Sequence, residues 1–272
     1  MRLLLVLALA LVAGCGGEER LSAPQDLHEG TATVLESPEH GPELCVGGQA
    51  DSLPPQCGGV PLVGWDWAAV DGEERVRGTT WGAYTVVGRY DGEVLEVVDV
   101  RPPKPPDRRQ VDLSTPCDEP DGGWPVDAAR SSEDALQDAA RVARAEPDFA
   151  AFWVDHQAPP DESGVGAHTV LNVAFTGDLP RHEQDLRAVW GGALCVVEHP
   201  RSLAELQRAQ DELVGGVAAE LGLTMTHAGV DEPGGVVDLG VVAATDEQRA
   251  ALAERYGDGV VVLQPGLVPV ER

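Results

Sequence analysis

The sequence contains very few basic residues. It has 19 lysines and arginines against 46 aspartates and glutamates, and Lys104 is its single lysine. The resulting formal net charge of -27 argues against a nucleic-acid partner, because binding to phosphates requires Lys and Arg side chains. It also argues against adhesion to anionic lipid headgroups through a basic face. We expect an acidic exterior that keeps the protein soluble at a crowded surface.

Common catalytic and metal-binding motifs are also missing. There is no Gly-x-Ser-x-Gly elbow, and His182-Glu183 is not followed by the second histidine of a zinc-binding His-Glu-x-x-His pair. The glycine pairs Gly47-Gly48 and Gly215-Gly216 are not followed by the Lys-Ser/Thr of a phosphate loop. We therefore predict a protein that is not an enzyme and that uses no cofactor and no metal.

The N-terminus has the features of an export signal. Arg2 precedes an apolar run from Leu3 to Val12, and small residues follow. Val12-Ala13-Gly14-Cys15 resembles a bacterial lipobox. This resemblance implies that residues 1–14 are removed and that Cys15 carries a diacylglyceryl anchor with acyl chains such as palmitate. The alternative is an ordinary signal peptide with an incidental cysteine.

The predicted anchor sets the location of the protein. Two acyl chains are enough for stable membrane attachment. Residues 15–30 are polar and predict a lipidated tether, and no later apolar run reaches the ~18 residues of a transmembrane helix. We expect the body at the outer face of the bacterial cytoplasmic membrane.

Four further cysteines predict two disulfides. Cys45, Cys57, Cys117 and Cys195 are an even number in an exported chain, and three pairings are available. Cys45–Cys57 is preferred because both cysteines lie in one Gly- and Pro-rich loop, which leaves Cys117–Cys195. A zinc site is the alternative, but the spacing matches no Cys-x-x-Cys pattern and an oxidising compartment disfavours it.

Residues 31–101 predict a small β domain. Strand-like runs flank the tight-turn dipeptide Asp91-Gly92, and four or more strands in ~70 residues suggest a small barrel of the OB-like kind. The segment Leu44 to Trp67 resembles one found in uncharacterised actinobacterial lipoproteins. Proline-rich residues 102–126 predict a stiff linker and an ordered loop, which separate this domain from residues 127–272.

Four aromatic residues of the β domain are a candidate binding face. Trp65 and Trp67 lie two residues apart, so on a strand they would share one face. With Trp81 and Tyr84 they would form a platform for a sugar or a peptide. The alternative is that all four form the core of a small domain that has few other large apolar residues.

Residues 127–272 contain an internal repeat. A helix from Ser131 to about Ala145 precedes the first copy. Each copy reads strand, strand, helix, strand, and the offset between copies is constant from the second strand onward, with a longer first loop in the first copy. A helix from Ser202 to Leu221 joins the copies, with a capping box at its start, a weak point at Gly215-Gly216 and a stop at Gly222. We predict an α+β fold: the barrel, followed by an α/β sandwich of two ββαβ repeats bridged by this helix.

The same half resembles a propeptide. Trp153-Val154-Asp155, Arg201-Ser202-Leu203-Ala204-Glu205 and Gly229-Val230-Asp231 are similar to the propeptide region of streptogrisin and α-lytic-type secreted serine proteases. The resemblance covers about Phe149 to Val270 and implies a folding aid or inhibitor of a protease. It also implies that the tail, residues 266–272, contacts the protease active site. No protease domain follows in this sequence.

Two smaller features carry expectations of their own. The polar loop from His156 to His168 is a candidate contact surface or a tolerated insertion. His156 and His168 are able to meet Asp155 there, although loop histidines are usually solvated. Asp155 and Asp231 recur at matched turns and are interpreted as turn residues.

The working hypothesis for function combines these features. We expect a membrane-anchored, non-catalytic lipoprotein that binds or scaffolds an envelope or secreted protein. The alternative is a stand-alone, propeptide-like inhibitor or folding aid of a secreted serine protease.

Overall fold

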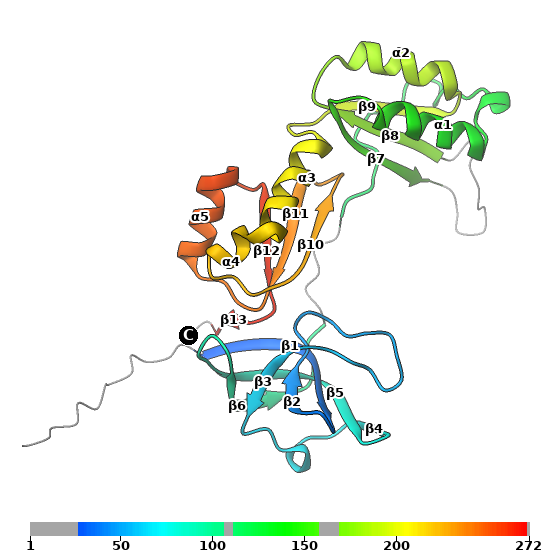
Figure 1. Ribbon diagram of the computed structural model, residues 1–272. Coiled ribbons are helices and arrows are strands. Elements are labelled where there is room, and N and C mark those ends of the chain that lie inside the picture. Colours follow the sequence, from blue (N-terminus) through cyan, green and yellow to red (C-terminus); the bar gives the residue numbers. More distant parts are fainter. Residues whose placement is uncertain (1–26, 106–110, 158–168, 271–272) are drawn as a thin grey trace, which may run out of the picture.

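The computed structural model describes residues 27–105, 111–157 and 169–270 of the chain. Figure 1 shows three bodies in a row: a barrel, a first α/β unit at the far end, and a second α/β unit between them. The expected class, mixed α+β with a barrel in the N-terminal half and further sheets in the C-terminal half, is confirmed. The predicted signal (1–14), Cys15 and most of the tether lie outside the described residues.

The N-terminal body is a closed five-stranded barrel. Its strand order is β1-β2-β3-β6-β5, and β5 pairs with β1 to close it. Strands β3 and β6 run parallel, and the other neighbouring barrel strands run antiparallel. The strands are β1 (Leu27–Ser37), β2 (His40–Leu44), β3 (Val60–Val63), β4 (Glu74–Val76), β5 (Thr79–Tyr90) and β6 (Leu95–Arg101), and the 3₁₀ turn η1 (Trp67–Ala69) follows β3.

The barrel has an apolar interior and a second cluster on its outside. Val34, Leu44, Val86 and Leu95 are fully or almost fully buried inside it. On the outer side, Leu35 and Trp81 pack against the disulfide Cys45–Cys57. The disulfide therefore fixes the long β2–β3 loop to the barrel wall.

The first α/β unit is built around a three-stranded sheet in the order β7-β8-β9. Helices α1 and α2 cover one face, where Leu136, Leu186 and Phe175 share a core. Its elements are η2 (Ala128–Arg130), α1 (Glu133–Arg144), β7 (Phe149–His156), β8 (Thr169–Phe175), α2 (Leu179–Val189) and β9 (Ala193–Glu198). Helix α1 is capped by Ser132 rather than by the expected Ser131, because the Ser132 hydroxyl accepts from the Ala135 amide.

The other face of this sheet is covered by the chain that enters the unit. We call residues 111–126 the strap. Cys117 of the strap forms a disulfide with the buried Cys195 of β9, and Trp124 packs beside it. Both disulfides are those that the sequence analysis preferred.

The second α/β unit has its own sheet, β10-β11-β12, and its own core. The joining helix begins at the predicted capping box of Ser202 and Glu205. It is interrupted at Gly216, whose φ of 141° is not helical, as the sequence led us to expect for this glycine pair. The elements are α3 (Leu203–Glu212), the π-helical turn η3 (Leu213–Val217), α4 (Ala218–Glu220), β10 (Met225–Asp231), β11 (Val236–Val241), α5 (Asp246–Tyr256) and β12 (Val261–Pro265).

The C-terminal tail joins the second unit to the barrel. Strand β13 (Val268–Pro269) pairs with the start of β1, and Leu267 is 1% exposed within the barrel core. Residues 27–30, which the sequence analysis placed in the tether, therefore belong to the barrel. The two α/β units have separate sheets and separate cores.

Candidate functional site

A cleft of 670 Å³ lies at the junction of the two α/β units. Its volume is within the range of ordinary ligand sites, which are commonly found between domains. Parts of the chain that are distant in sequence contribute to it: the strap, α1, β7, β10 and β11. The residues that line it are Val111, Leu113, Arg144, Phe152, Trp153, His227, Gly229, Val230, Asp231, Glu232, Pro233 and Asp238.

The floor of the cleft is the face of the second sheet that its helices leave uncovered. His227, Gly229 and Asp231 alternate along β10, so the side chains of His227 and Asp231 point to this face, whereas Ala228 and Val230 pack toward the helices. Asp238 of β11 pairs directly with Gly229. Among the described residues, a Cβ atom placed on Gly229 would meet no heavy atom within 4 Å. The described part of the chain therefore leaves space above the center of the floor.

The walls combine apolar surface with an ion pair. Phe152 and Trp153 contribute from β7, and the exposed Leu113 contributes from the strap. Arg144 of α1 forms two contacts of 3.2 Å with the two carboxylate oxygens of Glu232 in the β10–β11 turn. This two-point geometry connects the first unit to the second across the rim of the cleft.

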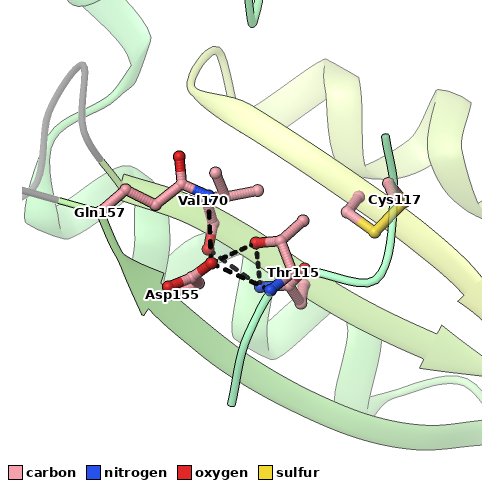
Figure 2. Close-up of a disulfide and its surroundings, with 7 residues drawn as sticks. Thr115, Cys117, Asp155, Gln157 and Val170 are labelled. Carbon is pink, nitrogen blue, oxygen red and sulfur yellow. Dashed lines mark hydrogen bonds between the residues drawn. A yellow bond between two sulfur atoms is a disulfide. The ribbon is translucent and has the colours of Figure 1, made fainter. Parts of the chain in front are cut away.

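Asp155 anchors the strap at Thr115, two residues beyond the cleft-lining Leu113. Its Oδ2 atom accepts hydrogen bonds from the Thr115 amide (2.9 Å), the Thr115 hydroxyl (2.8 Å) and the Gln157 amide (3.1 Å), as Figure 2 shows. Burial raises the pKa of Asp155, but these hydrogen bonds outweigh it and hold the pKa below its ordinary value. The disulfide at Cys117 fixes the strap two residues further on.

The four aromatic residues proposed as a binding face do not form one surface. Trp65 and Trp67 follow β3 and do not lie on a strand. Their rings pack edge-on against each other and against Tyr84, with centroids 5.2 to 6.3 Å apart. Trp81 lies in the separate outer cluster with the disulfide. Trp81 and Tyr84 are both buried, so this geometry agrees with the alternative interpretation of these rings as packing residues.

The remaining candidates from the sequence are the two matched aspartates and the two histidines of the polar loop. Asp231 accepts a hydrogen bond from the Gly234 amide, which is the turn role expected for it, whereas Asp155 holds the strap instead. The ring of His156 lies 3.5 Å from the Thr169 hydroxyl. His168 and most of the candidate loop lie outside the described residues.

A cluster of three groups able to ligate a metal was missed by the sequence analysis. The ligand atoms of Glu146, Asp148 and His182 lie within 4.8 Å of one another. Two of the three bind each other, since His182 Nε2 lies 2.7 Å from Asp148 Oδ2, and Glu146 accepts from the Arg181 guanidinium at 2.8 Å. Because Arg181 brings a positive charge to the cluster, we interpret the network as an anchor for the start of α2.

The cleft brings several parts of the chain to one surface with both apolar and charged lining. The sequence signal for it was indirect, since Gly229 and Asp231 were noted in the repeat but not as lining residues. In the part of the chain that the structure describes, no helix is long and apolar enough to cross a membrane. The sequence matches no protein-family model, and it matches no curated protein sequence.

Proposed function

We propose that the protein is a membrane-anchored extracytoplasmic lipoprotein that binds an envelope or secreted protein in the cleft and catalyses no reaction. Cys15 is the attachment point in this proposal. The observation that carries it is the cleft, whose floor has no side chain at Gly229 and whose walls combine apolar side chains with the Arg144–Glu232 ion pair. The two disulfides support an exported location, because such bonds persist in oxidising compartments.

The proposal includes two finer statements about the fold. The barrel order β1-β2-β3-β6-β5 with its parallel β3–β6 pair supports an OB-like barrel. The two α/β units support a duplicated ββαβ element, because their hairpins share one register. Trp153 pairs with Asn172 in the first unit, and Gly229 pairs with Asp238 at the corresponding place in the second.

The binding role is tested by site-specific photocrosslinking in cells. A photoreactive amino acid replaces Leu113, which lines the cleft and is 47% exposed. The matched control replaces Val98, which is 48% exposed on the barrel and is not part of the cleft. We expect a defined partner from position 113 and not from position 98. The same captured proteins from both positions, or none from position 113, would contradict a role for the cleft.

The anchor needs a separate test. Replacing Cys15 with serine should remove the acylation site and release the protein from the membrane fraction. Mass spectrometry of the wild-type N-terminus should find a diacylglyceryl-modified cysteine. A wild-type protein that is soluble and unlipidated in the culture medium would refute the anchored location.

The protease-inhibitor alternative receives less support from the geometry. The tail proposed to enter a protease active site is held by the barrel, with Leu267 buried and Val270 donating to the Leu27 carbonyl at 2.8 Å. Strand β13 would first have to leave β1. Inhibition of a trypsin- or chymotrypsin-like protease by micromolar protein would restore this alternative.

A further inference from the structure

The barrel and the second α/β unit share one hydrophobic core, although the first unit separates them in the sequence. Val242, which follows β11, and Leu267 of the tail are buried in the barrel cluster beside Val34 and Leu44. The Leu267 amide also donates to the Val242 carbonyl at 2.8 Å. Strand β13 pairs with β1, and Figure 1 shows it between the second unit and the barrel. The second unit therefore completes the core of the barrel.

The tail lies directly against the barrel wall. A Cβ atom added to Gly30 of β1 would lie 2.7 Å from the Gly266 carbonyl oxygen. A Cβ atom added to Gly266 would collide with the side chain of Val46. Neither position has space for a side chain, because carbon atoms in contact lie about 3.5–4 Å apart. The barrel, the second unit and the tail thus form one close-packed body, which we call the composite body (residues 27–101 and 203–270).

The boundary between the first unit and the composite body is built differently. The two sides have separate cores. Arg144 pairs with Glu232 across the boundary, and their side chains keep exposed fractions of 46% and 24%. The guanidinium of Arg201, in the connecting segment, donates to the carbonyls of Gly235 (3.2 Å) and Asp258 (3.4 Å). Exposed polar contacts of this kind contribute less to stability than a buried leucine does, so this boundary is the weaker of the two.

The chain leaves the first unit through residues 199–202, just before α3. The His199 amide still donates to the Phe175 carbonyl of the first sheet at 2.8 Å. At the start of α3, Leu203 packs against the core of the first unit, and Leu206 lies in the core of the second. A rotation between the two sides would therefore be centered on the start of α3.

We propose that the first α/β unit rotates about the start of α3 relative to the composite body, and that this rotation opens and closes the cleft. The ion pair Arg144–Glu232 is the latch of the closed form. Phe152 and Trp153 move with the first unit, while Gly229 stays in the floor. Polar boundaries between domains permit such movement. As a way of admitting a partner the rotation rests on the function proposed above, but the motion itself needs no partner.

Distances between two spin labels measure this motion in the full chain, purified in a neutral detergent. The labels are attached to a keto amino acid, which leaves the native cysteines intact. One pair crosses the boundary, with labels at Glu183 of α2 and Val214 of η3. The matched pair lies within the composite body, with labels at Val98 of β6 and Val214. All three positions are at least 48% exposed.

The two label pairs should behave differently. We expect a single narrow distance between Val98 and Val214. Between Glu183 and Val214 we expect two distances, one for the closed and one for the open form. The share of the open form should rise with salt concentration, because salt screens the exposed ion pair of the latch.

Charge variants identify the latch. Arg144→Glu places two acidic groups opposite each other, and we expect the ratio of open to closed form to rise about two- to fivefold, which corresponds to about 0.4–1 kcal/mol. Adding Glu232→Arg to this variant should restore the wild-type ratio. Arg141→Glu is the matched control, because Arg141 pairs with Asp138 within α1. Circular dichroism checks that each variant is folded, and the salt dependence of the wild-type protein decides the question if one is not.

The outcomes separate this inference from the proposed function. One unchanging distance between Glu183 and Val214, two distances between Val98 and Val214, or equal effects of Arg141→Glu and Arg144→Glu would overturn the inference. Photocrosslinking from Leu113 tests the binding role independently. A captured partner with an immobile first unit would leave a binding site without a hinge. A mobile first unit with no captured partner would leave the hinge without the proposed function.

Discussion

Removal of the disulfide Cys117–Cys195 should destabilise the protein more than removal of Cys45–Cys57. A disulfide restricts the unfolded chain, and the restriction grows with the logarithm of the bridged length. Cys117 and Cys195 are separated by 78 residues, for which the loop-closure relation gives about 4.5 kcal/mol. Cys45 and Cys57 are separated by 12 residues, for which it gives about 3 kcal/mol.

The two disulfides should also stabilise different parts of the protein. Cys117 holds the strap over the first sheet, and Cys195 is 1% exposed next to Val170 and Trp124. Loss of this bond should expose β8 and β9 first. Loss of Cys45–Cys57 should affect the barrel wall around Leu35 and Trp81 instead.

The assay is urea unfolding of the two Cys→Ala double variants, followed by hydrogen–deuterium exchange and mass spectrometry. Peptides from β8 report the first unit, and peptides from β5 report the barrel. We expect the Cys117/Cys195 variant to lose protection in β8 at lower urea than wild type, with little change in β5. A larger loss from the Cys45/Cys57 variant, or a loss spread equally over both bodies, would refute this reasoning.

Three other substitutions test separate parts of the structure. Leu267→Ala should lower the unfolding free energy of the barrel by about 2–5 kcal/mol, because the truncated side chain leaves a cavity in its core. The tail amides should then exchange hydrogen faster. Unchanged exchange would contradict the docking of β13. His182→Ala should lower the unfolding free energy of the first unit by about 2–4 kcal/mol, since it removes a buried ring and leaves Asp148 without that partner. Denaturant unfolding measures this change. A change under about 0.5 kcal/mol would show that the network is not an anchor. Asp155→Asn should destabilise the strap at neutral pH and much less in acid. Because the folded pKa of Asp155 is lowered, its contribution is complete above the unfolded value of about 4 and is lost as pH falls through the folded value. Equal destabilisation at neutral and acidic pH would contradict an ionised Asp155 that binds Thr115.

Local features of the fold could be predicted from the sequence because their causes are local. The capping box of Ser202 and Glu205 involves two residues three positions apart, and the interruption at Gly216 follows from the properties of glycine itself. The preference for Cys45–Cys57 depended on two cysteines in one short loop. Each of these required only neighbours along the chain.

The places of two other sequence-derived candidates, the aromatic residues and the tail, depended on contacts between distant residues. Trp65 and Trp67 follow a pattern that fits a strand, but the nearby ring of Tyr84 and the turn after β3 determine where they pack. The tail was expected from the propeptide resemblance to contact a protease, yet Leu267 is buried in the barrel core, where β13 pairs with the start of β1. No local periodicity encodes such contacts, since they connect residues that are distant in the sequence.

The sequence by itself determined the acidic character and predicted the capped helices, the repetition of a hairpin in residues 127–272 and a preference for the two disulfides that form. Only the tertiary structure decided that the strap covers one repeated face and leaves the other open. The physical reason is that the disulfide at Cys117 commits the strap to the first sheet. In the sequence Gly229 is one more small residue in a predicted strand, but in the structure it lies in the floor of the cleft.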